Sequence, residues 1–454
     1  MVTRKRIELT EEQVARVWQQ VIGRELTGTE GQRIAVVYPG RINGNGPDFR
    51  DAVIAGGPDL MRGDVEVHTR SGDWYRHGHH RDSEYNNIIL HVAMWHDCHS
   101  ATLLQSGRTV PVLGLAQALQ HQAYLLPCRL PCFRALHRMD RTTLTGLLRA
   151  AGEERFRQKA MRFQSEILRP DMFITHPSAG QVLYRGMMRA LGYSKNTKSF
   201  EELSSRVPLT SLEPEEGLTR RQALLLGTAG LLPSQRPCLA AADDEKVHTL
   251  ERIWRSIRSR VEPMSERDWR LSHIYPNNSP VRRIVAQSYL LERYCTLRCR
   301  EPAGSRLMAG LLELVQEVPA QGPHRALADG LAVTGDGYWQ CHFDFGASGR
   351  TRTSSLLGNG KTGEILVNVL LPFFFTLGKL AGRPDLMQKT MELHHSYPKL
   401  AENEITRHMA GQLGLEGLSG LTACHQQGLI HIFRDYCREG RCSSCPLTRE
   451  TRPA

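Results

Sequence analysis

The stretch that decides the fold of the N-terminal region is Gly63-Asp64-Val65-Glu66-Val67-His68-Thr69-Arg70. Successive side chains of a β-strand point to opposite faces of a sheet. The two valines would therefore face a core, while the ionisable side chains at 64, 66, 68 and 70 would share the other face. The stretch predicts a strand over 60–70 with one apolar and one ionisable face.

The elements expected around this strand form a mixed α/β domain. Thr10 and Gln13 make a capping-box pattern, and the apolar residues that follow predict a helix over 11–25. Strands are expected over 32–38, 48–55 and 60–70, divided by turn-forming, glycine-rich runs. The apolar run over 88–95 predicts a further strand, buried on both faces. A short helix in the polar segment 73–85 would complete the order α-β-β-β-α-β.

The rest of the chain is expected to be mostly helical. We divide it into an α/β domain over 1–122, a basic helical domain over 123–300, and a mostly helical C-terminal domain over 301–454 with a cysteine-rich end. Helical spacing predicts helices over 143–168, 179–191, 221–232, 248–261 and 281–298. Glycines and aromatic residues over 335–357 interrupt this pattern and indicate a hairpin or an ordered loop.

Composition excludes a disordered chain. The 454 residues are 40% hydrophobic and 23% charged, and 58 Lys and Arg against 47 Asp and Glu give a net charge of +11. This excess is spread along the chain. It could attract a polyanion, or it could serve solubility alone.

Cysteine content and the longest apolar run bear on the compartment. The odd count of eleven cysteines, and a start without the pattern of a secretory signal, predict a reducing compartment and a cytoplasmic protein. The longest apolar run, 365–377, is shorter than the roughly 18 residues of a spanning helix. It also contains Asn368 and Pro372. We expect a buried core element there and no membrane segment.

A hairpin would bring a second carboxylate beside Glu66. Asp48 follows Pro47 at the start of the preceding strand, and carboxylates on adjacent strands form the oxygen-rich site that Mg²⁺ or Mn²⁺ prefers. Such an ion can polarise a phosphodiester and lower the pKa of a water. The alternative is that Asp48 closes a turn while Asp64, Glu66 and Arg70 form ion pairs on a solvated sheet face.

This order of elements, with Pro47-Asp48 opening one strand and Glu66-Val67-His68 on the next, resembles the PD-(D/E)xK nuclease superfamily. The resemblance implies that Asp48 and Glu66 are metal ligands. It also implies that His68 takes the place of the usual Lys, which orients the attacking water. Histidine is mostly neutral at pH 7, so His68 would act as a base or a third ligand without a permanent charge.

Further ionisable residues would surround this site. Asp64, on the same strand face, is an additional candidate catalytic carboxylate. Glu11 and Glu12 could add a ligand for a second metal ion, as first-helix acids do in some members of that superfamily. Alternatively, they only complement the N-terminus of the first helix.

The densest group of imidazoles lies over 73–82, and further histidines follow at 91, 96 and 99. If the site is nuclease-like, His79 and Asp82 would contact the scissile region or a phosphate, with Arg70 as a further contact to nucleic acid. One alternative is a dinuclear zinc hydrolase, although the order of Asp and His does not match that signature. The other is an exposed polar helix or loop.

Basic side chains in the helical region could hold a phosphate backbone. Arg155, Lys159 and Arg162 fall on one helix face, and Arg282 and Arg283 recur further on. A solvated helix face is the alternative. The sequence contains no signature of a module that reads bases, so such binding would depend only weakly on sequence.

The C-terminal cysteines give the strongest metal signal. Cys437, Cys442 and Cys445 lie within nine residues, and Gly440 permits a tight turn between them. A fourth ligand could be Cys424, His425 or His431, for Zn²⁺ or a [4Fe–4S] cluster. The alternative is a set of reduced cysteines in a buried turn. The pairs Cys128/Cys132 and Cys295/Cys299 have helical spacing and are expected to be small buried apolar residues.

Several stretches together resemble a bacterial family of unknown function, domain of unknown function 2851. They lie at 63–68, 73–79, 90–92, 190–193, 367–372 and 426–430. They span most of the chain, and the resemblance implies a bacterial cytoplasmic protein without supplying an activity.

We therefore expect a divalent-metal-dependent nuclease that hydrolyses phosphodiester bonds in DNA or RNA, with DNA favoured as the partner and a protein partner left open. The alternative is a catalytically inactive, nuclease-like protein that binds nucleic acid or acts as a scaffold.

Overall fold

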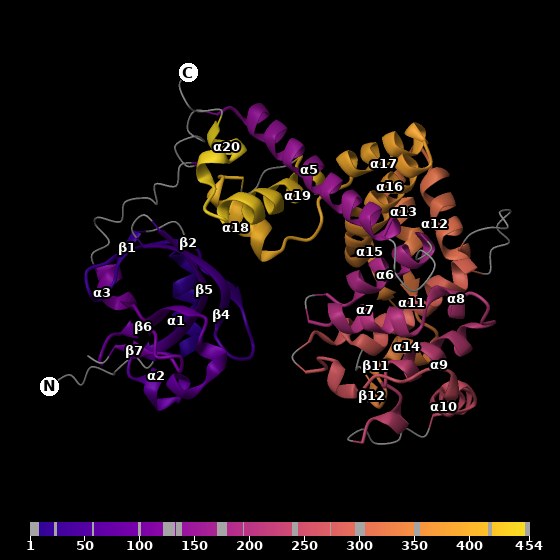
Figure 1. Ribbon diagram of the computed structural model, residues 1–454, viewed down its shortest axis with the longest axis horizontal. Helices are drawn as coiled ribbons and strands as arrows, with labels where there is room; N and C mark the ends of the chain where they lie inside the picture. The colour runs from indigo at the N-terminus through magenta and orange to yellow at the C-terminus, as the bar shows by residue number, and fades with distance from the viewer. Residues whose placement is uncertain are drawn as a thin grey trace. The chain divides into compact units, whose positions relative to one another are not determined.

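A computed structural model describes residues 9–21, 25–56, 59–98, 101–120, 132, 139–169, 179–193, 195–237, 244–272, 274–295, 305–348, 355–415 and 420–449. The chain divides into two compact units (Figure 1). The first comprises residues 1–151, 402–419 and 428–454, and the second comprises residues 152–401 and 420–427. The units differ from the three expected domains, because most of residues 402–454 belongs with the N-terminal sheet and residues 301–401 belong with the helical unit.

A seven-stranded mixed sheet forms the centre of the first unit. Its strands are β1 Glu25–Thr27, β2 Arg33–Tyr38, β3 Arg41–Ile42, β4 Phe49–Gly56, β5 Asp59–Arg70, β6 Ile88–Trp95 and β9 Val112–Gly114. Their order is β1-β2-β4-β5-β6-β9, with β3 beside β4. Pairing is antiparallel from β1 to β5, whereas β6 is parallel to β5 and to β9. The strands predicted over 32–38, 48–55, 60–70 and 88–95 are confirmed as β2, β4, β5 and β6.

Helix α1 (Glu11–Gln20) packs on one face of this sheet. The predicted capping box is present, since the Thr10 side chain accepts from the Gln13 N–H and the Gln13 side chain accepts from the Thr10 N–H. Val14 and Trp18 of α1 share a core with the two valines of β5. The helix ends five residues earlier than expected, and Gly23, a poor helix former, follows it.

A short segment covers the opposite face of β5 and β6. It contains α2 Asp73–Arg76 and the 3₁₀ turns η1 His79–Arg81 and η2 Ser83–Tyr85, and the small strands β7 Thr102–Leu103 and β8 Thr109–Val110 follow β6. A separate small core of Trp74, Tyr85, Ile88, Leu104 and Val110 lies here. The elements α1, β2, β4, β5, α2 and β6 therefore follow the predicted order α-β-β-β-α-β.

The remaining helical elements of the first unit are α3 Leu115–Gln120, α18 Glu404–Gln412, α19 Ala423–Ile432, whose first residues belong to the second unit, the π-helical η9 Phe433–Cys437, the 3₁₀ turn η10 Cys442–Ser444 and α20 Pro446–Arg449. Within the first unit, Tyr38 of β2 meets His408 of α18 and Phe433 of η9, with ring centroids 5.2 and 4.9 Å apart. Arg62 of β5 pairs with Glu439 at 3.1 Å. These contacts attach the C-terminal segment to the sheet.

The second unit is a helical assembly around one large core. Its helices are α5 Arg141–Ile167, which begins before the unit boundary, α6 Ala179–Leu191, α7 Thr197–Arg206, α8 Leu209–Leu212, α9 Leu218–Thr228, α10 Glu245–Ile257, α11 Pro280–Cys295, α12 Arg306–Gln316, α13 Pro323–Leu331, α14 Gly337–Cys341, α15 Asn359–Ile365, α16 Leu371–Leu380 and α17 Pro384–Ser396. Short 3₁₀ turns are η4 Pro233–Gln235, η5 Arg258–Arg260, η6 Glu266–Asp268 and η7 Pro276–Asn278.

The region expected as a hairpin or ordered loop contains two short strand pairs and α14. Strand β10 (Val333–Thr334) pairs with β13 (Ser355–Leu357), and β11 (His342–Asp344) pairs with β12 (Ala347–Ser348).

The longest apolar run is helical. Helix α15, the π-helical η8 (Leu366–Leu370) and α16 form one run, Asn359–Leu380, that is long and apolar enough to cross a membrane. Its most apolar window is 67% buried. The run is therefore apolar because it is buried inside the second unit, as predicted for a core element.

Candidate metal and active site

Two carboxylates meet where β4 and β5 begin to pair. Asp48 precedes β4, and Glu66 lies beside it because Phe49 is paired with Val65. The Asp48 N–H donates to Glu66 Oε2 at 3.0 Å, and the Val67 N–H donates to Asp48 Oδ2 at 3.1 Å. These reciprocal bonds fix both groups and use one oxygen of each. The structure thus brings the two predicted carboxylates together.

Burial raises the pKa of the Glu66 carboxyl well above its ordinary range, and the Asp48 carboxylate raises it further. Burial also raises the pKa of Asp48, and Glu11 acts on both groups as a like charge. A cation placed between the carboxylates would have the opposite effect, because it favours their ionised form. The pair is therefore an electrostatically favourable place for a divalent ion.

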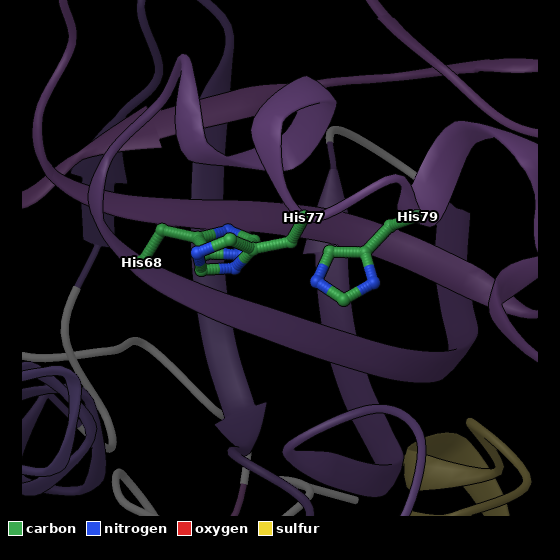
Figure 2. A group of neighbouring side chains, drawn as sticks. All are labelled: His68, His77 and His79. Atoms are coloured by element: carbon green, nitrogen blue, oxygen red, sulfur yellow. The ribbon is translucent and has the colours of Figure 1, made fainter.

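Three imidazoles converge on this side of the sheet (Figure 2). His68 comes from β5, His77 follows α2 and His79 opens η1, and one ring nitrogen of each lies within 4.8 Å of the others. Glu66 Oε1 lies 3.3 Å from His79 Nε2 and 3.8 Å from His68 Nε2. In the part of the chain that the structure describes, no other group of three or more potential ligands is this compact.

A second histidine orients His68. His68 Nδ1 lies 3.0 Å from His91 Nε2, and His91 Nδ1 lies 2.8 Å from Thr102 Oγ1. Burial lowers the pKa of both rings far below the ordinary value, so both are neutral near pH 7. If His91 donates to Thr102, its Nε2 accepts the proton of His68 Nδ1. The buried His68 Nε2, which has no hydrogen-bond partner among the described residues, then carries a lone pair that could bind a metal ion.

Hydrogen bonds at the end of β5 fix the segment that follows it. The buried Asp73 carboxylate accepts from Thr69 Oγ1 at 3.1 Å and from the Arg70 N–H at 3.2 Å. It also pairs with Arg76 at 2.5 Å. Gly78, with a φ of +80°, permits the reversal between α2 and η1. This local network holds the imidazoles at 77 and 79 over the strand.

Glu11 and Glu12 differ in their contacts. Glu11 Oε1 lies 3.9 Å from His77 Nδ1, which places Glu11 at the border of the imidazole group. Glu12 pairs with Arg16 at 2.7 Å on the exposed side of α1. Glu11 is thus the acidic residue of the first helix that could contribute to a metal site.

Asp64, expected as a further catalytic carboxylate, bonds to the backbone of a bulge in the neighbouring strand. A bulge in β4 gives Asp51 a positive φ of 60°, and the Asp51 N–H donates to Asp64 Oδ1 at 3.1 Å. Asp64 is buried, and this bond uses one of its oxygens. Its role is to satisfy the backbone of the bulge.

Exposed guanidinium groups flank the site. Arg70 is exposed, pairs with Asp97 at 3.1 Å and lies over the Trp95 ring at 5.9 Å. Arg81 ends η1, two residues after His79, and the described residues offer its exposed guanidinium no partner. His79 itself, expected to contact nucleic acid, faces Glu66 instead.

The basic face predicted on α5 is only partly open. Arg155 Nε and Lys159 Nζ donate to Gln427 Oε1 at 2.8 and 2.6 Å, and Lys159 Nζ also donates to Asn368 Oδ1 at 2.6 Å. Arg162 is exposed. Of these three predicted phosphate contacts, Arg162 alone is exposed, and Arg155 and Lys159 are half-buried.

Arg282 and Arg283 are buried, so the prediction that they bind nucleic acid is wrong. Arg282 donates to the carbonyls of Trp339, His342 and Ser355 at 2.8 to 3.1 Å. Arg283 donates to the Leu356 carbonyl at 2.6 Å, to the Tyr193 hydroxyl at 2.9 Å and to Asn278 Oδ1 at 2.8 Å. Both guanidinium groups anchor the irregular region around β11 and β13.

The three C-terminal cysteines share a cavity, and the expected fourth ligand does not join them. Cys437, Cys442 and Cys445 line one cavity in the first unit. Cys424 lies thirteen residues before Cys437 on the continuous helical run of α19 and η9. This spacing corresponds to about 20 Å along a helix axis. Cys132, expected only as a buried apolar residue, lines the same cavity as the three.

The two histidines considered as fourth ligands have other partners. His431 Nδ1 pairs with Asp435 at 3.0 Å. His425 Nδ1 accepts from the Thr422 N–H at 3.0 Å.

Comparison with known families decides the membership of the chain. The family described as "Protein of unknown function (DUF2851)" matches residues 11–403. The chain belongs to this family. No curated protein and no solved structure matches the chain. In this DUF2851 member, the matched residues include the carboxylate pair and all four histidines of the candidate site, and they end before Cys437.

The donor set of the DUF2851 site differs from the oxygen-rich site that the sequence predicted. Two carboxylates are accompanied by imidazole nitrogens, which suit Mn²⁺, Zn²⁺ or Fe²⁺ better than Mg²⁺. The pattern Asp48…Glu66 was visible in the sequence. Glu11 was considered from the sequence as a metal ligand, whereas the roles of His77 and His91 were not predicted, although the density of histidines over 73–99 was a signal that the segment carries a site.

Proposed function

We propose that this DUF2851 protein is a divalent-metal-dependent phosphodiester hydrolase that cleaves nucleic acid, with Asp48, Glu66, His68 and His79 as the metal ligands. The observation that carries the proposal is the position of Glu66. One of its oxygens is bound to the backbone of Asp48, and the other faces the ring nitrogens of His79 and His68.

The charges around the site favour an anionic substrate. The whole chain has a net charge of +11, and Arg70 and Arg81 are exposed on the elements that carry the ligands. Arg81 is suited to bind a phosphate oxygen, because its guanidinium has no protein partner among the described residues and charge-assisted bonds to phosphate are strong. We keep DNA as the first polymer to test and RNA as the second.

Each side chain has a separate task. Asp48 and Glu66 would neutralise and hold the ion, His91 would keep His68 Nε2 unprotonated, and Arg81 would hold the phosphate. A bound divalent ion would polarise the phosphoryl group and lower the pKa of a water.

The test is cleavage of labelled single- and double-stranded DNA and RNA, with Mn²⁺, Zn²⁺ or Mg²⁺ supplied separately. Glu66→Gln keeps an acceptor for the Asp48 N–H and removes the charge. Glu30→Gln, the same change at an exposed position of the first unit, is the matched control. We expect cleavage with Mn²⁺ to exceed cleavage with Mg²⁺, and Glu66→Gln to lower the rate by at least about 100-fold. Equal rates in both variants would contradict the proposal.

A second candidate rests on His68, which stands where the nuclease superfamily has Lys. Its ring is buried and neutral. A protein that has lost the Lys would bind nucleic acid without cleaving it. His68→Lys separates the candidates: it would create activity in a disabled nuclease, whereas it would abolish activity if His68 is a ligand, because an ammonium group beside the ion would repel it. Wild-type binding without cleavage by any of the three metals would favour the second candidate.

A further inference from the structure

Four cysteines from distant parts of the sequence line one cavity of about 120 Å³ in the first unit. They are Cys132, Cys437, Cys442 and Cys445. The rest of the lining is mostly apolar and consists of Val37, Ala55, Leu60, Gln412, Tyr436, Leu447 and Thr448. Such a cavity combines soft sulfur ligands with a largely apolar wall.

Residues between 436 and 448 line one part of this cavity. Cys437 ends the π-helical η9, where the Arg438 N–H donates to the Phe433 carbonyl at 2.7 Å. Gly440 then turns with a φ of +65°, and a Cβ at this position would lie 2.6 Å from Leu60 Cδ1. The positive φ favours glycine at this turn, which brings η10 and α20 back against the sheet.

Cys132 reaches the cavity from elsewhere in the sequence, about 300 residues before Cys437. Gln412 Nε2 lies 3.1 Å from its Sγ, a contact in which the amide donates to sulfur. Hydrogen bonds of this kind stabilise a thiolate that ligates metal.

The separation of the sulfurs distinguishes a single ion from a cluster. Four thiolates around one Zn²⁺ at about 2.3 Å lie about 3.8 Å from each other. Here no three of the four sulfurs lie within 4.8 Å of one another, since the described residues contain only the histidine group at that spacing. The cavity between them is also far larger than the roughly 10–15 Å³ that one water requires. One ion would leave this space largely empty.

We propose that Cys132, Cys437, Cys442 and Cys445 ligate a [4Fe–4S] cluster that fastens the C-terminal segment to the sheet of the first unit. A cubane core is several atoms wide and keeps its four thiolates well apart, as the cavity does. With four cysteine ligands the cluster is coordinatively closed, so its role is structural. This proposal is independent of the proposed hydrolase activity and is tested without an activity assay.

The first test is analysis of the full chain purified without oxygen. We expect four irons and four acid-labile sulfides per chain, with broad visible absorption that bleaches on reduction. One zinc per chain, two irons with two sulfides, or neither metal after reconstitution with iron and sulfide would each overturn the proposal.

Variants identify the fourth ligand. Cys132→Ser should lose the cluster or retain at most three irons, whereas Cys424→Ser, at the ligand expected from sequence, and Cys98→Ser, outside the cavity, should keep four. Circular dichroism checks that each variant is folded. If Cys132→Ser does not fold, Gln412→Leu provides the second test, since it removes the bond to the Cys132 sulfur and should shift the reduction potential of a cluster. A full four-iron cluster in folded Cys132→Ser, or an unchanged potential in Gln412→Leu, would contradict the assignment.

Discussion

At the scale of single residues, the account depends on His91, which touches His68 and lies outside the proposed ligand set. Its Nε2 is 3.0 Å from His68 Nδ1. His91→Phe keeps an aromatic ring in the buried space and removes both nitrogens, so His68 would lose its fixed tautomer. We expect Mn²⁺ affinity, measured by calorimetry, to fall about 10–100-fold. Thr102 is hydrogen-bonded to His91 and not to His68, so Thr102→Val should lower the Mn²⁺ affinity less. If the two variants lower the affinity equally, His91 does not act by orienting His68.

The buried arginines of α11 allow a test of stability. Arg282 is fully buried and donates to three carbonyls. Arg282→Met leaves these acceptors without partners, and we expect the free energy of unfolding to fall by about 3–5 kcal/mol. Urea unfolding measures it, with the exposed Arg267→Met as the control. A loss below about 1 kcal/mol would mean that Arg282 does not anchor the region around β11 and β13.

His408 gives a prediction about pH. Burial lowers its pKa from 6.5 to about 4, and in the described part of the chain neither ring nitrogen has a hydrogen-bond partner. The unfolded chain therefore binds a proton that the folded chain does not, so stability is complete above pH 6.5 and falls as the pH drops toward 4. His408→Phe should remove up to about 1.4 kcal/mol of this loss per pH unit. The two proteins are compared by urea unfolding on either side of pH 6.5, and parallel pH profiles would rule out this role.

At the scale of elements, the bulge in β4 separates a structural carboxylate from the proposed ligands. Asp64 accepts from the N–H of Asp51. Asp64→Asn keeps an acceptor, so we expect cleavage within about threefold of the wild type, whereas Asp64→Leu should cost about 1–3 kcal/mol of stability. Both are measured on the same preparations, by cleavage rate and by urea unfolding. A loss of cleavage in folded Asp64→Asn as large as in Glu66→Gln would restore Asp64 to the active site.

The elements themselves were largely predictable from the sequence. The strand at 88–95 and the helix at 179–191 match β6 and α6, because a continuous apolar run and a helical repeat are local signals. The carboxylate pair was also predictable, since a hairpin fixes the register of adjacent strands. No role was assigned to His91 from the sequence. Its partner His68 lies on the neighbouring parallel strand, and the register of two parallel strands cannot be predicted from the spacing of residues along the chain.

At the scale of the whole molecule, the sequence misplaced the boundaries of the units. Periodicity predicts where a helix lies but not which sheet it packs on, so residues 402–454 were expected in a separate helical domain. In the structure, most of this segment belongs to the first unit, where His408 and Phe433 pack on Tyr38. For the same reason, the sequence did not predict that Cys132 lines a cavity with three cysteines about 300 residues further along the chain.

The central claim is that the first unit binds a divalent ion between Asp48, Glu66 and the imidazoles. The most direct test is calorimetric titration of Mn²⁺ into the wild type and Glu66→Gln, prepared identically and with the cysteine site characterised in both. We predict a site in the wild type whose affinity falls by at least about 100-fold in Glu66→Gln and is unchanged in Glu30→Gln. Identical Mn²⁺ titrations of wild type and Glu66→Gln would contradict the claim.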